Sequence, residues 1–142
     1  MPHRVCLVVM LAAFASLLAA CGTTERETSD RDLRRVEVEA VAAVVEGDRE
    51  DVAVIDVRSA DAFAAGHLPG AIHMPLPELE LGDPRLEGVK AVIVYGRSPR
   101  DPLAPAGAKK LHAQGLNDVR LFTGGFTAWQ REGREIKPSE AR

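Results

Sequence analysis

The chain has 142 residues, of which 46% are hydrophobic, 27% are charged and only 4% are aromatic. This length suffices for one domain of ordinary size and not for two, and the formal net charge of -3 gives no electrostatic reason to expect a nucleic acid as a partner. The two cysteines, Cys6 and Cys21, both lie near the N-terminus. The rest of the chain can therefore form neither a disulfide framework nor a cysteine zinc site, and we predict no metal and no cofactor.

The first twenty residues have the pattern of an export signal. A short basic start precedes an apolar run over residues 5–20, interrupted only by Ser16. The run is short for a membrane span and close in length to the core of a signal peptide. Together with the small residues before Cys21, it resembles the lipobox of bacterial lipoproteins. That resemblance implies cleavage before Cys21, lipidation of its sulfur, and attachment of an exported domain to a bacterial membrane. The alternative is an uncleaved anchor helix.

Three segments follow from this organisation. We expect residues 1–20 to be a lipoprotein signal peptide. Residues 21–32 are polar and unpatterned, which predicts a flexible tether. The folded domain is then expected over residues 33–142.

Within the domain, apolar runs alternate with helical patterns. Continuous apolar runs are typical of strands buried on both faces of a parallel sheet, and alternating strands and helices indicate an α/β fold. The predicted elements in chain order are a helix over 38–46, a strand over 52–57, a short helix over 60–65, a short strand over 71–73, an irregular stretch over 75–84, a strand over 91–95, a helix over 106–114, a strand over 119–122 and a helix over 124–131.

Two strings in this domain resemble the signatures of rhodanese-like domains. The first lies between Asp56 and Pro75 and contains DVR and GHLPGAIHMP, and the second lies between Gly115 and Trp129 and contains GLNDV and GGFTAW. With their spacing they cover roughly residues 36–136. The resemblance implies a single rhodanese-like α/β domain with a central, mostly parallel sheet flanked by helices on both faces.

The loop after the strand at 91–95 departs from the family's active pattern. In that family the loop begins with a cysteine whose thiolate carries sulfur as a persulfide, and the backbone N–H groups of the loop cradle the anion. Here the first position is Gly96, and no cysteine follows Cys21. Three prolines, Pro99, Pro102 and Pro105, each lack an N–H group. The resemblance therefore implies a loop that lacks the catalytic sulfur, which excludes phosphatase chemistry through the same cysteine as well.

This altered loop is the candidate site, either for an anion or as a vestige of an active site. Arg97 and Arg100 could bind an oxyanion or could be solvated loop charges. Arg58 could contact an anion or support the local structure, whereas Asp56 is expected to fix the turn after its strand. We predict no catalytic residue, because a serine in the loop would need an adjacent base that no spacing suggests. The candidate residues are Gly96, Arg97, Ser98, Pro99, Arg100, Asp101 and Arg58.

Other noticeable residues have simpler structural interpretations. We expect His67 to pack in the turn before Pro69 rather than to act as a base, and His73 and His112 to be structural or surface residues. Gly124 and Gly125 are expected to allow a close backbone approach at a helix start. Trp129 is expected in the core.

The sequence thus favours a non-catalytic rhodanese-like binding or accessory module at the cell envelope, which recognises an unknown protein partner or a small oxyanion. The alternative is a thiosulfate sulfurtransferase-type enzyme that uses an unrecognised or partner-supplied thiol. A decayed domain without a binding role is the third hypothesis.

Overall fold

The computed structural model describes residue 29, residues 33–47 and residues 49–139. The predicted signal peptide, and the predicted tether apart from Ser29, lie outside these described residues. No helix within the described ranges is long and apolar enough to cross a membrane.

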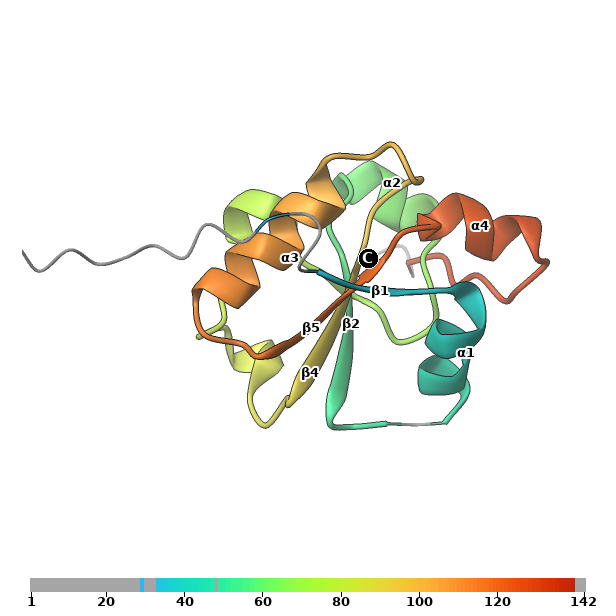
Figure 1. Cartoon of the computed structure of the whole chain (residues 1–142). Helices are drawn as coiled ribbons and strands as arrows, with labels where there is room; N and C mark the ends of the chain where they lie inside the picture. The colour runs from blue at the N-terminus through green and yellow to red at the C-terminus, as the bar shows by residue number, and fades with distance from the viewer. Residues whose placement is uncertain (1–28, 30–32, 48, 140–142) are drawn as a thin grey trace, which may run out of the picture.

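A parallel sheet with helices on both sides forms the domain (Figure 1). All strand pairs of the sheet are parallel, and the strand order is β1-β5-β4-β2-β3. The elements are β1 Arg34–Val36, α1 Val38–Glu46, β2 Val52–Asp56, α2 Ala60–Ala65, β3 Ile72–His73, the 3₁₀ turns η1 Leu76–Glu78 and η2 Pro84–Leu86, β4 Ala91–Tyr95, α3 Leu103–Ala113, β5 Asp118–Phe122 and α4 Gly125–Arg131. The predicted α/β fold with a mostly parallel sheet is confirmed.

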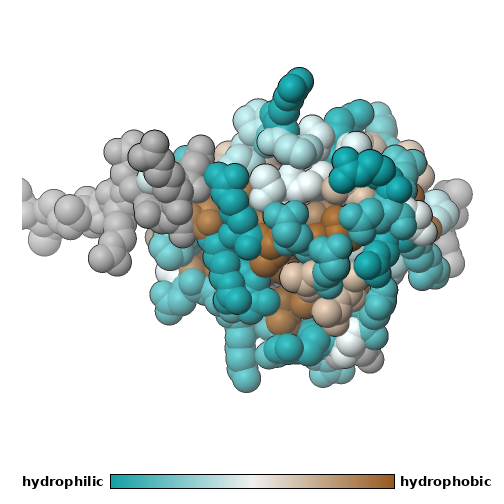
Figure 2. All heavy atoms as spheres, turned by 45° about the vertical axis from the view of Figure 1, so that its right-hand side comes forward, coloured by the Kyte–Doolittle hydropathy of each residue, from teal (hydrophilic) through white to brown (hydrophobic). Residues whose placement is uncertain are grey.

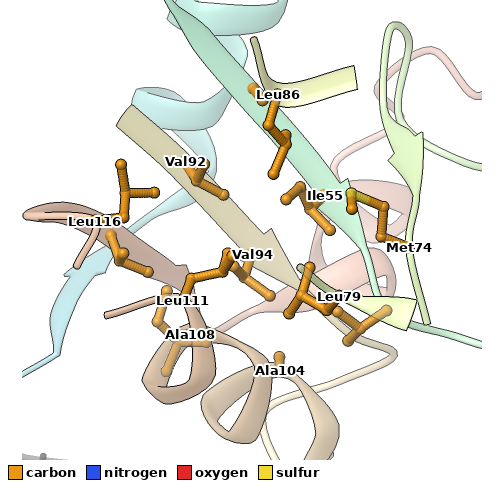
Figure 3. Packing of buried hydrophobic residues seen from close by; sticks show 14 of the residues in the cluster. Ile55, Met74, Leu79, Leu86, Val92, Val94, Ala104, Ala108, Leu111 and Leu116 are labelled. Atoms are coloured by element: carbon orange, nitrogen blue, oxygen red, sulfur yellow. The ribbon is translucent and has the colours of Figure 1, made fainter. Parts of the chain in front are cut away.

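The two central strands are buried on both faces, as their continuous apolar runs predict. Every residue of β2 and β4 is buried. Because side chains alternate along a strand, Val92 and Val94 of β4 pack in one core with Ala108 and Leu111 of α3 (Figure 3). Their neighbours along β4 pack in a second core with α1 and α4, which includes Trp129. Trp129 is 2% exposed, so its predicted core position is confirmed.

Two elements differ from the sequence prediction. Helix α3 begins at Leu103, three residues before the predicted start at Ala106. Pro105 lies within its first turn, where a missing N–H group costs nothing because no helical acceptor precedes it. Strand β1, which the sequence did not predict, pairs with β5 at the edge of the sheet. Its three residues are too few to show a hydrophobic period.

The segment after α4 returns to the turn that follows α2. His67 and Lys137 form an antiparallel bridge through two backbone hydrogen bonds of 2.9 and 3.0 Å. The N–H group of Ser139 donates to the carbonyl oxygen of Ala64 (3.1 Å). The indole N–H of Trp129 donates to the carbonyl oxygen of Glu135 (2.7 Å). Figure 2 shows the side of the molecule that carries α1 and α4, where hydrophilic residues cover most of the surface.

Candidate functional site

The candidate loop lies at the carboxyl end of β4, between that strand and α3. Open α/β sheets place their binding sites at this edge. Gly96 is buried directly after the strand, Ser98 is half-buried, and Arg97, Pro99 and Arg100 are exposed. The predicted site residues of the loop are therefore brought together at one end of the sheet.

Asp101 organises the loop from within. Its Oδ2 accepts a hydrogen bond from the N–H group of Arg97 (2.7 Å), and its Oδ1 accepts one from the N–H group of Leu103 (2.9 Å). The N–H group of Asp101 donates to the carbonyl oxygen of Ser98 (3.0 Å). The carboxylate therefore closes the loop and also caps the first turn of α3, whose positive end favours a negative charge.

The start of α4 holds the other side of the loop. Phe126 and Thr127 donate their N–H groups to the carbonyl oxygens of Gly96 (3.0 Å) and Arg97 (2.9 Å), and the Thr127 hydroxyl donates to the Arg97 carbonyl as well (2.8 Å). Gly125 has a φ of 58°, and a Cβ atom there would lie 2.7 Å from the Gly96 carbonyl oxygen. The predicted close approach at the glycine pair is confirmed at Gly125.

The two cationic side chains of the loop are exposed at its outer surface. Within the described part of the chain, the guanidinium groups of Arg97 and Arg100 form no ion pair. The Ser98 hydroxyl makes no hydrogen bond to another described residue either. The outer surface of the loop therefore carries exposed positive charge.

Arg58 lies in a buried network with Asp56 and Tyr95. Arg58 Nη2 donates to Asp56 Oδ2 (2.6 Å) and to the carbonyl oxygen of Gly66 (2.7 Å), and its guanidinium lies 4.1 Å from the ring centre of Phe126. Burial opposes the charge of Arg58, but hydrogen bonds and the charge of Asp56 outweigh it and raise the pKa of Arg58. These contacts favour the structural interpretation of Arg58 over contact with an anion.

Tyr95 completes this network from the end of β4. Its hydroxyl donates to Asp56 Oδ2 (2.6 Å) and accepts from the N–H group of Leu68 (3.2 Å). Burial, followed by the charge of Asp56, raises the pKa of Tyr95 well above its usual value. Asp56 and Tyr95 are fully buried and Arg58 is 5% exposed, so the network joins β2, β4 and the turn at Leu68 with almost no exposure to solvent.

The two histidines of the first signature pack on one aromatic ring. The His67 ring stacks on Phe63 at 3.8 Å between centroids, and His73 stacks on the same ring at 4.7 Å. Nδ1 of His67 lies 3.0 Å from the carbonyl oxygen of Phe63, and Nε2 of His73 lies 2.9 Å from that of Arg58. Both contacts agree with the predicted structural roles.

A cavity of about 440 Å³ lies beside the loop. It extends from Pro99 to the start of α1 and to α4, with the acidic residues Glu37, Glu39 and Glu132 and the basic residue Arg131 in its lining. A smaller cavity of about 150 Å³ shares Pro99 and Thr123 with it and is also lined by Asp101. In the part of the chain that the structure describes, no group of three or more His, Cys, Asp or Glu residues could hold a metal ion.

Comparison with known proteins agrees with this architecture. The profile of the rhodanese-like domain matches residues 39–132, which is most of the folded part. The chain belongs to the rhodanese-like domain family. The thiosulfate sulfurtransferase GlpE of Pseudomonas putida is 34% identical to it over 85 residues, which are 58% of this chain and 73% of that protein.

Other relatives are more distant or longer. The HTH-type transcriptional regulator Rv0324 of Mycobacterium tuberculosis is 30% identical over 86 residues, which are 61% of this chain but only 38% of the regulator. The crystal structure of the BH2092 protein from Bacillus halodurans superposes with a TM-score of 0.69 at 26% identity, covering 75% of this chain and 77% of that one.

Two residues of this rhodanese-like domain have roles that sequence reasoning did not assign. Asp101 appeared among the loop residues, but its part in closing the loop was not foreseen. An aspartate two residues before a helical N–H group is a usual capping signal. Because the predicted helix starts at Ala106 and not at Leu103, Asp101 lies too far from the predicted start to be identified as a cap. Tyr95 appeared only as the end of a strand, and nothing in the local sequence indicates its contact with Asp56.

Proposed function

We propose that this rhodanese-like domain is a non-catalytic binding or accessory module, anchored at the cell envelope through lipid at Cys21. The observation that carries the proposal is the loop after β4. It begins with Gly96 and no cysteine follows Cys21, so the domain has no sulfur nucleophile of its own. A serine cannot replace it, because an oxygen cannot form a persulfide and, among the described residues, no base is hydrogen-bonded to the Ser98 hydroxyl.

Recognition through the outer surface of the loop is supported by its charge and exposure. Arg97 and Arg100 are exposed, and neither forms an ion pair with another described residue. Guanidinium groups bind carboxylates and oxyanions with two parallel hydrogen bonds. A protein partner or a small oxyanion is therefore the proposed ligand of this module.

The alternative function is that of a sulfurtransferase. Relatives about 30% identical to this chain are named thiosulfate sulfurtransferases, which favours this second candidate. The reaction would need a thiol supplied by a partner or by a small molecule.

Release of thiocyanate from thiosulfate and cyanide separates the two candidates. The full-length chain, purified in detergent, is assayed with and without glutathione, and GlpE of Pseudomonas putida is assayed in parallel as the active control. We expect no turnover above that of a protein-free sample under either condition. Thiocyanate release in proportion to the amount of the chain would replace the binding proposal by the enzyme.

Cross-linking in cells tests the binding role directly. We expect the wild-type chain to capture a specific protein, and the double variant R97A/R100A to lose it. The matched control is R49A, because Arg49 is an exposed arginine that precedes β2 and therefore lies at the opposite end of the sheet. Equal capture by all three proteins would contradict recognition through the loop. If nothing is captured, a rise in the melting temperature with thiosulfate, sulfate or phosphate would support an anion as ligand instead, and its absence would leave the domain without a binding role.

A further inference from the structure

The place of a side chain at residue 96 is occupied by another residue of the same loop. A Cβ atom on Gly96 would lie 2.6 Å from Oδ2 and 2.9 Å from Cγ of Asp101, distances that real Cβ contacts essentially never show. The carboxylate is held there by the N–H groups of Arg97 and Leu103. It cannot turn aside without losing these two hydrogen bonds.

The contact with Asp101, and not the backbone conformation, opposes a side chain at position 96. The φ of Gly96 lies outside the left-handed region, so an alanine or a cysteine would meet no backbone strain there. The next neighbour, Cβ of Ala104, would lie at 3.3 Å, which needs a shift of only a few tenths of an ångström. Asp101 is therefore the main obstacle to a side chain at the first loop position.

We propose that Asp101 obstructs the first position of the loop: its carboxylate occupies the volume and the backbone N–H groups that a thiol side chain at residue 96 would use. Gly96 and Asp101 thus form one coupled unit, and a cysteine at position 96 alone does not produce an accessible thiolate. This inference deepens the proposed non-catalytic function, because the loop then departs from an active one at two coupled residues rather than at one.

A double-mutant cycle on the full-length chain in detergent measures the coupling. G96A adds only the Cβ atom that meets the carboxylate, and D101A removes that carboxylate. We expect G96A to lower the melting temperature by several degrees in the wild-type background. In the D101A background the same change should leave the melting temperature unchanged or raise it, because alanine restricts the unfolded chain more than glycine does.

The matched control for this cycle is G82A. Gly82 also has a φ outside the left-handed region, and a Cβ atom there meets nothing within 4 Å. Its melting-temperature shift should therefore be the same with and without D101A. If G96A behaves like G82A, with equal shifts in both backgrounds, Asp101 does not obstruct position 96 and the proposal is wrong.

Thiol reactivity gives an independent measurement. Alkylation of the introduced cysteine by iodoacetamide at pH 7 is followed on the peptide that contains residue 96, so Cys6 and Cys21 do not interfere. Removal of a neighbouring carboxylate opens the position and favours the thiolate, so G96C/D101A should react at least about tenfold faster than G96C. G82C, alone and with D101A, is the control and should react equally in both. Equal rates for the two variants at residue 96 would also overturn the proposal.

These outcomes are separate from those of the proposed function. Thiocyanate release by the wild-type chain would refute the non-catalytic function without affecting the coupling between residues 96 and 101. Additive stability changes would refute the coupling and leave the non-catalytic function standing.

Discussion

Replacement of Tyr95 by phenylalanine tests the buried network at the carboxyl end of β4. The side chain is fully buried, and phenylalanine keeps its ring and its contact with Phe122, so packing is preserved. The change removes the hydrogen bond to Asp56 and leaves the N–H group of Leu68 without its partner. A hydrogen bond to a charged group contributes about 1.5–3 kcal/mol, and an unsatisfied buried group costs about 1–3 kcal/mol. Because the two effects overlap, we expect the free energy of unfolding to fall by about 2–4 kcal/mol, out of the roughly 5–15 kcal/mol typical of a domain.

Urea denaturation at pH 7, followed by the fluorescence of the buried Trp129, measures this loss. The dependence of the free energy on urea concentration should be the same in wild type and Y95F, because the substitution does not change the area exposed on unfolding. A loss below about 0.5 kcal/mol would mean that Asp56 and Leu68 find other partners, and it would refute the network as a source of stability.

The raised pKa of Tyr95 adds a pH dependence with a definite sign. In the folded state the phenol stays protonated, whereas in the unfolded chain it ionises near its usual value of about 10. Above that pH the unfolded state binds fewer protons, so the stability of the wild type falls by about 1.4 kcal/mol per pH unit from this group. The stability difference between wild type and Y95F should therefore be about 1.4 kcal/mol smaller at pH 11 than at pH 9. A constant difference would contradict the buried position of the hydroxyl.

Three further predictions follow from single residues. G125A should lower the free energy of unfolding by about 2–4 kcal/mol, because the alanine would have a positive φ and its Cβ atom would collide with the loop. The control is G133A, where φ is also positive but a Cβ atom meets nothing within 4 Å; it should lower the free energy of unfolding by only about 1–2 kcal/mol in the same urea titration. Asp83, whose hydrogen bonds with Arg85 lower its pKa to about 2, should stabilise the chain above pH 4 and lose this effect as the pH falls toward 2; D83N should flatten that part of the acid unfolding curve. C21S should release the protein from membranes or leave it unprocessed, and membrane fractionation and gel mobility identical to those of the wild type would contradict lipidation.

The parts of the fold that the sequence predicts are those whose signals are local. The short apolar runs VAVID and AVIVY predict strands buried on both faces, and they form β2 and β4. The glycine pair before α4 indicated a close backbone approach, because only glycine fits where two chain segments nearly touch, and Gly125 meets the loop there.

The remaining features depend on contacts between distant residues. Strand β1 exists because β5 offers it a free edge, and no property of Arg34–Val36 alone requires it. The two roles left open for Arg58 could be separated only by the positions of Gly66 and Phe126, which come from elsewhere in the chain. Asp101 could not be identified as an obstruction from sequence, because its carboxylate reaches back to Gly96 only in the folded loop.

The backbone bridge between His67 and Lys137 has a consequence for the size of the folding unit. The family match covers residues 39–132, so it omits β1 and also the segment that supplies this bridge and the acceptor of the Trp129 indole at Glu135. A fragment trimmed to those limits would uncover an edge of β5 and leave a buried indole N–H group without its acceptor. We therefore expect a stable fragment of this chain to extend beyond residues 39–132 at both ends.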